Sequence, residues 1–118
     1  TNEDARRIRA VDSPEAEMVA DLILKYGTAS MLGDQEEKRI PIHDALALCA
    51  VRYPQVLKTE HCSCHVDTSE GISYGQTVID RRNPSNAGAP NCYFAHGADR
   101  EFFLSWIVDT LTKAKERK

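Results

Sequence analysis

The sequence has no long apolar run, no internal repeat and no large excess of either charge. No stretch approaches the ~20 consecutive apolar residues of a membrane-spanning helix, and no signal peptide opens the chain. Charged residues make up 28% of the chain with both signs interspersed, and the formal net charge is -3. A dedicated nucleic-acid binder usually concentrates its basic residues on one face. We therefore expect a soluble, cytoplasmic protein that binds neither membrane nor nucleic acid.

The composition also lacks anything that would divide the chain, because it has no low-complexity tract and no obvious interdomain linker. A length of 118 residues suits a single domain and allows a real hydrophobic core. Segments with helical spacing alternate with segments typical of strands, and short loops join them. This mixture predicts a layered α/β arrangement.

Two helices are predicted before residue 30. The first covers 3–11, and the second restarts within 12–15, where Asp12 or Ser13 caps the helix ahead of a proline. Gly27 is expected to end the second helix. The residues expected on the inner faces are Ile8 and Val11 of the first helix, and Ala16, Val19, Leu22, Ile23 and Tyr26 of the second.

The region after Pro54 is typical of strands. Two runs rich in β-branched residues flank a turn at 69–71, which predicts a β-hairpin. The expected strands are, in order, 56–66, 72–79 and 92–95. A last helix follows, and Asp99 is expected to cap it. The residues expected on its inner face are Phe103, Thr110, Leu111 and either Trp106 or Ile107.

The four cysteines raise the question of zinc, because the run His61-Cys62-Ser63-Cys64-His65 mixes thiols and imidazoles. Alternation along a strand would place both cysteines on one face and both histidines on the other. Side chains split across a sheet cannot converge on one tetrahedral ion, and Cys-x-Cys is tighter than the usual zinc spacings. We interpret the cysteines as reduced, buried, small hydrophobes, with a Cys/His metal module as the alternative.

The most informative motif is His43-Asp44, between Ile40-Pro41-Ile42 and the apolar run 45–51. Proline fixes φ and biases its predecessor toward extended backbone, so the approach should be stiff and non-helical. The apolar run is rich in Ala and Leu and stops at Pro54, which predicts a short buried helix. The pair therefore falls at a helix N-terminus, where the dipole favours a carboxylate and disfavours an imidazolium.

A carboxylate beside a titratable imidazole at a rigid junction could serve as a metal ligand next to a general acid. The residues alone leave an alternative open, in which Asp44 only caps the helix and His43 is an exposed neighbour. The polar stretch 33–39 leads to this junction, and we expect it to form a mobile loop of the kind that often becomes a lid.

Pro41-Ile42-His43-Asp44 followed by an Ala/Leu helix resembles the C-terminal signature of the inosine–uridine-preferring nucleoside hydrolases. The most specific part of the resemblance is the string Gly75-Gln76-Thr77-Val78-Ile79-Asp80-Arg81-Arg82, a fixed distance downstream. The resemblance covers nearly the whole chain, because it also includes Arg7-Ile8-Arg9-Ala10, His65-Val66-Asp67-Thr68-Ser69-Glu70-Gly71, Pro90-Asn91 and the closing amphipathic helix.

The resemblance implies that residues 1–118 are a single C-terminal segment of a layered α/β fold with a mostly parallel sheet, helices and a β-hairpin. It also implies hydrolysis of the N-glycosidic bond of ribonucleosides to a free base and ribose, with one Ca²⁺ bound deep in a pocket. Carried onto this sequence, Asp44 matches a calcium-ligand aspartate. His43 matches the histidine that can donate a proton to the leaving base.

The sequence departs from the family pattern in two ways. The Asp-rich N-terminal motif, which supplies most calcium ligands and the catalytic base, is absent, so we expect no activity from these residues alone. We expect pairing with the missing N-terminal part or a homo-oligomer. Gln35 stands where several relatives carry an aromatic residue that helps handle the base. The alternative function is a split or degenerate, inactive relative that acts as an assembly or regulatory subunit.

Overall fold

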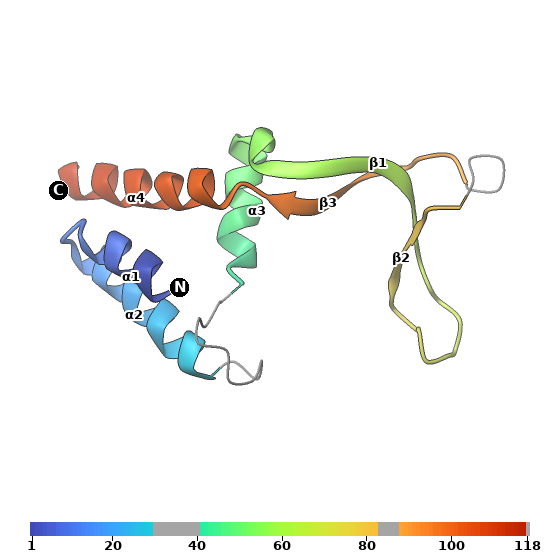
Figure 1. Cartoon of the computed structure of the whole chain (residues 1–118), viewed down its shortest axis with the longest axis horizontal. Helices are drawn as coiled ribbons and strands as arrows, with labels where there is room; N and C mark the ends of the chain where they lie inside the picture. The colour runs from blue at the N-terminus through green and yellow to red at the C-terminus, as the bar shows by residue number, and fades with distance from the viewer. Residues whose placement is uncertain (30–40, 83–87, 118) are drawn as a thin grey trace. The chain divides into compact units, whose positions relative to one another are not determined.

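The computed structural model describes residues 1–29, 41–82 and 88–117 (Figure 1). The chain divides into two compact units, Thr1–Val56 with Asp99–Lys118, and Leu57–Ala98. The first unit is helical and the second is a three-stranded sheet, so the chain has the predicted α/β composition. No helix within the described ranges is both long enough and apolar enough to cross a membrane.

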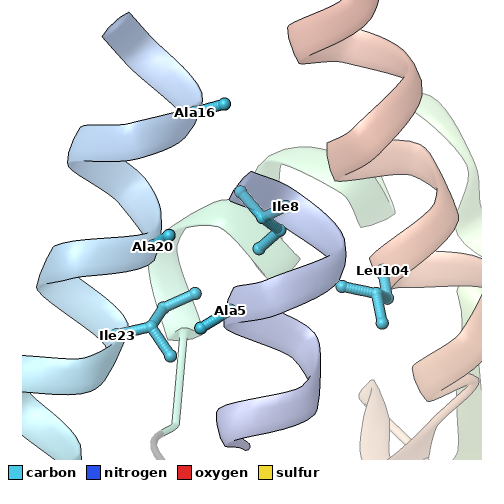
Figure 2. Packing of buried hydrophobic residues seen from close by; sticks show 6 residues of the cluster. All are labelled: Ala5, Ile8, Ala16, Ala20, Ile23 and Leu104. Atoms are coloured by element: carbon cyan, nitrogen blue, oxygen red, sulfur yellow. The ribbon is translucent and has the colours of Figure 1, made fainter. Parts of the chain in front are cut away.

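The core of the helical unit lies between three helices, α1 (Asn2–Arg9), α2 (Pro14–Ala29) and α4 (Arg100–Glu116). Figure 2 shows α1 between the other two, with the buried side chains pointing into the contacts. Three of these side chains are alanines, which allow the helices to approach closely. The buried residues of the cluster are Ala5, Ile8, Ala16, Ala20, Ile23 and Leu104.

The N-termini of these helices are capped by polar side chains. Thr1 and Asp4 form a capping box at α1, and Asp4 also accepts a hydrogen bond from Arg100 of α4 at 2.7 Å. Ser13, one of the two predicted caps, accepts a hydrogen bond from the Ala16 N–H at 3.2 Å. The predicted cap of α4 is confirmed, because the Asp99 carboxylate accepts from the Phe102 N–H at 2.9 Å. Each cap satisfies an N–H group that has no partner within its helix.

The prediction for the second helix is wrong in its end and in part of its inner face. The helix continues through Gly27 to Ala29, because one glycine weakens a helix by only about 1 kcal/mol. Leu22 and Tyr26 are exposed, at 45% and 62%. They lie about 80–120° around the helix from the Ala16–Ala20–Ile23 stripe on which α1 packs. In α4 the buried position is Leu104, whereas the predicted Thr110 is exposed.

The sheet consists of β1 (Leu57–Val66), β2 (Thr77–Asp80) and β3 (Cys92–Ala98) in the order β2-β1-β3. The long β1 pairs with both neighbours, through residues 63–66 with β2 and 57–62 with β3 (Figure 1). Both pairings are antiparallel, so the expected mostly parallel sheet is not found among the residues that can be described. The ten-residue connection at 67–76 reverses the chain, whereas a parallel pairing needs a crossover of about a dozen residues or more.

The β1–β2 hairpin is confirmed, but its second strand is shorter than predicted. Asp67 accepts hydrogen bonds from the backbone and hydroxyl of Ser69, at 2.9 and 2.6 Å, and from the Ser73 hydroxyl. These bonds lower the pKa of Asp67 to about 2. The turn ends at Gly75, whose φ of 80° lies in the left-handed region. Residues 72–75 therefore belong to the turn rather than to a strand.

Candidate functional site

The predicted junction at His43-Asp44 is confirmed as a helix start. Helix α3 runs over His43–Arg52, directly after Ile42, which is its N-cap with φ -114° and ψ 75°. The helix ends before Pro54, which begins a short 3₁₀ helix, η1 (Pro54–Val56). Ile42 has a non-helical backbone, and the Ala/Leu run that follows it continues without interruption to Arg52, as the sequence indicated.

Several contacts hold α3 within the helical unit. Cys49 is fully buried on one side of the helix, and burial raises the pKa of its thiol. The Tyr53 ring packs edge-on against Phe102 of α4, with ring centroids 5.7 Å apart. The Asp99 N–H donates to the Val56 carbonyl at 2.7 Å, which joins η1 to the cap of α4. The helix that carries the candidate site is thus fixed at its C-terminal end.

Asp44 is not the cap of α3. The N-cap is Ile42, which forms no side-chain capping bond, and the first helical bond runs from the Leu46 N–H to the Ile42 carbonyl at 3.2 Å. Asp44 instead occupies the first turn of the helix, where backbone N–H groups have no partner within the helix. The capping interpretation of Asp44 is therefore wrong.

The two candidate side chains leave the helix start in different directions. His43 and Asp44 are both exposed, and adjacent residues on a helix diverge by about 100°. The imidazole and the carboxylate are thus both accessible at the start of α3. The loop predicted at 33–39 and Gln35 lie outside the described residues.

A calcium ion takes about six to eight oxygen ligands. No group of three or more His, Cys, Asp or Glu side chains that could hold a metal ion occurs within residues 1–29, 41–82 and 88–117. Asp44 offers one carboxylate, so these residues do not fit a calcium site by themselves.

The run 61–65 does not gather its histidines and cysteines at one point. His61 stacks on Tyr93 with ring centroids 4.5 Å apart, and His65 shares a hydrogen bond of 3.0 Å with the Ser63 hydroxyl. Residues 61, 63 and 65 share one face of β1, and the cysteines at 62 and 64 share the other. These positions do not support the Cys/His metal module.

The string 75–82 has a structural role that sequence reasoning missed. Gly75 supplies the left-handed residue of the turn, and Asp80 at the end of β2 forms two hydrogen bonds with the Arg82 side chain, at 2.9 and 2.6 Å. These bonds hold the pKa of the Asp80 carboxyl well below its usual range. The sequence signal that could have predicted this ion pair is the close spacing of opposite charges in Asp80-Arg81-Arg82.

Comparisons with known proteins identify the class to which this fold belongs. The chain superposes on the purine-preferring ribonucleoside hydrolase from Gardnerella vaginalis with a TM-score of 0.72 and 22% identity, over 96% of this chain and 35% of that one. At this identity the similarity shows the shared fold.

The sequence comparisons define the family. The family model for inosine-uridine preferring nucleoside hydrolases matches residues 1–105. The chain is 31% identical over 114 residues to the pyrimidine-specific ribonucleoside hydrolase RihA of Shewanella sp. strain MR-7, covering 93% of this chain and 34% of that protein. It is 26% identical over 110 residues to the inosine-uridine preferring nucleoside hydrolase of Crithidia fasciculata, covering 92% and 34%. The chain therefore belongs to the inosine-uridine preferring nucleoside hydrolase family, and it spans about a third of the length of these relatives.

Proposed function

We propose that this chain is the C-terminal, proton-donating segment of a nucleoside hydrolase that cleaves the N-glycosidic bond of ribonucleosides to a free base and ribose. The observation that carries the proposal is the position of His43-Asp44 as the first two residues of α3, inside the 1–105 segment that matches the family. The start of α3 presents both side chains, and neither of them forms the N-cap.

His43 is proposed as the general acid. Cleavage leaves the electron pair of the C–N bond on the base, while water supplies the new oxygen on the sugar carbon, so the base departs more easily if it receives a proton. Imidazole is the side chain used most often as a general acid or base in proteins, and it can carry the proton that the base needs. Its exposed position at the start of α3 leaves the ring free to reach a substrate.

Asp44 is proposed as one oxygen ligand of Ca²⁺. Its carboxylate lies in the first turn of α3, and carboxylate oxygens are ligands that a hard cation such as Ca²⁺ prefers. The described residues supply no further ligand cluster, so the other ligands must come from elsewhere in the protein. A single ligand position is all that is assigned to Asp44.

Exposed apolar side chains support pairing with further parts of a longer or complementing chain. Leu48 and Val51 of α3 are 64% and 82% exposed, and Met18 and Tyr26 of α2 are 59% and 62% exposed. Large apolar side chains exposed on a helix are typical of a surface that another segment covers. Such a segment could belong to the same protein or to a second copy in a homo-oligomer.

The first test is hydrolysis of inosine and uridine by the protein expressed from its own gene, followed by measurement of free base and ribose. We expect release of both products in the presence of Ca²⁺. A protein of only this length, with no bound second chain and no release of base, would instead support the alternative of an inactive assembly or regulatory subunit. The intact mass of the purified protein, measured alongside, separates these outcomes.

The second test addresses Asp44 alone. Asp44→Ala should weaken calcium binding in a calorimetric titration, because it removes a charged oxygen ligand. Glu70→Ala is the matched control, since Glu70 is an exposed acidic residue in the sheet unit. An unchanged calcium affinity in Asp44→Ala would refute the ligand assignment without touching the role of His43.

A further inference from the structure

Three of the four cysteines lie together on one face of the sheet. Cys62 and Cys64 are alternate residues of β1, so they share a face, and Cys92 of β3 is the direct cross-strand partner of Cys62. All three are free thiols. Cys62 is only 6% exposed, while Cys64 and Cys92 are half-buried. The proposed hydrolytic site uses none of them.

The strand register makes Cys62 and Cys92 directly opposed residues, an arrangement whose usual spacing allows a disulfide. Directly opposed residues of an antiparallel pair have Cα atoms about 4.5–5.5 Å apart, and disulfides span about 4.4–6.8 Å. Cys64 is the diagonal neighbour of Cys92, a position typically about 7–8 Å away. The register therefore favours Cys62 over Cys64 as the partner of Cys92.

Asn91 fixes this register independently of the thiols. Its N–H donates to the Cys62 carbonyl at 3.0 Å, and its side-chain amide donates to the Cys64 carbonyl at 2.9 Å. The amide oxygen also accepts from the Cys64 N–H at 2.9 Å. Asn91 thus binds the backbone on both sides of Ser63 and holds the adjacent Cys92 opposite Cys62.

The electrostatics of Cys92 reflect its neighbours on this face. Burial, together with hydrogen bonding to the thiols of Cys64 and Cys62, raises the pKa of the Cys92 thiol to about 11.

We propose that Cys62 and Cys92 are a redox-modification site that forms a reversible cross-strand disulfide on exposure to a peroxide. One thiol gives up its proton and attacks a peroxide oxygen, the O–O bond breaks, the departing hydroxide takes up that proton as water, and a sulfenic acid forms. The second thiol attacks that sulfur, the S–S bond forms, and the hydroxyl leaves as water. Overall, two thiols lose two electrons and two protons, and hydrogen peroxide is reduced to two waters. The bond would lock β3 to β1 at the base of the hairpin.

The test uses the protein as expressed from its own gene, reduced, freed of metal with a chelator and exposed to hydrogen peroxide. Free thiols are then blocked, and peptides are mapped by mass spectrometry. We expect a Cys62–Cys92 peptide lighter by two hydrogen atoms than its reduced parts, and its loss after addition of a reductant. Predominant Cys64–Cys92 linkage, linkage between chains, or oxidation to sulfinic acid without a disulfide would overturn the proposal.

Serine variants give the matched controls. Cys64→Ser should still form the disulfide, whereas Cys92→Ser and Cys62→Ser should not. The peptide map of the unmodified protein decides the question even where a buried serine impairs folding. A Cys64→Ser protein that folds but no longer forms the bond would contradict the direct pairing. The outcome does not depend on whether the protein hydrolyses nucleosides.

Discussion

Ile8 is the residue whose truncation should damage the helical unit most. It is 1% exposed and lies on α1, which packs between α2 and α4 (Figure 2). Ile8→Ala removes three carbon atoms, worth roughly 2.5 kcal/mol of transfer free energy at about 0.8 kcal/mol each. Because the cavity opens between helices that cannot all relax into it, a further loss of about 1 kcal/mol is expected.

The expected total loss of about 3–4 kcal/mol in the free energy of unfolding can be measured by urea denaturation followed by circular dichroism. Leu22→Ala is the matched control, because Leu22 is 45% exposed on the neighbouring helix and should lose about 1 kcal/mol or less. Equal losses in the two variants, or a loss below about 1 kcal/mol for Ile8→Ala, would refute the packing of α1 as the centre of this unit.

Three further predictions concern the caps and the hairpin. Gly75→Ala should cost about 1–2 kcal/mol in thermal denaturation, because φ is 80° there although no neighbour lies within 4 Å of an added Cβ; a neutral change would contradict the left-handed turn. Asp99→Ala should lower stability by about 1 kcal/mol while Asp99→Asn should largely keep it; equal losses would argue against capping. Asp67 has a pKa lowered from 3.8 to about 2. Its contribution to the free energy of unfolding is therefore fully present above pH 3.8 and is lost as the pH falls through 2. Asp67→Asn should therefore remove part of the acid sensitivity of unfolding between these values, and identical acid titrations would contradict the hydrogen-bonded turn.

Elements with local signals could be predicted from the sequence. Pro41 and the Ala/Leu run marked the start of α3, and Asp99 marked the start of α4. Features that depend on tertiary packing could not be predicted. The buried side of α2 follows its alanines rather than its larger residues because α1 approaches closely on that side, and Gly27 does not end the helix.

The strand direction and the surroundings of the candidate site are two further features that the sequence did not predict. The hairpin was visible as two β-rich runs around a turn, but the mostly parallel sheet came from resemblance to much longer chains, and each pairing of the described strands is antiparallel. The sequence placed His43-Asp44 at a helix N-terminus, which is confirmed. It could not show what surrounds the pair, and the described residues hold no cluster of ligands that would complete a calcium site.

The most direct test of the proposed function compares leaving groups in His43→Ala. The purified protein, its His43→Ala variant and a His96→Ala control in β3 are assayed with inosine and with a nitrophenyl riboside, whose leaving group departs without a proton. We predict that His43→Ala slows inosine hydrolysis by about 100-fold or more, that it largely spares the nitrophenyl substrate, and that His96→Ala changes neither rate. Hydrolysis of inosine by His43→Ala at the parental rate would contradict the role of His43 as the general acid.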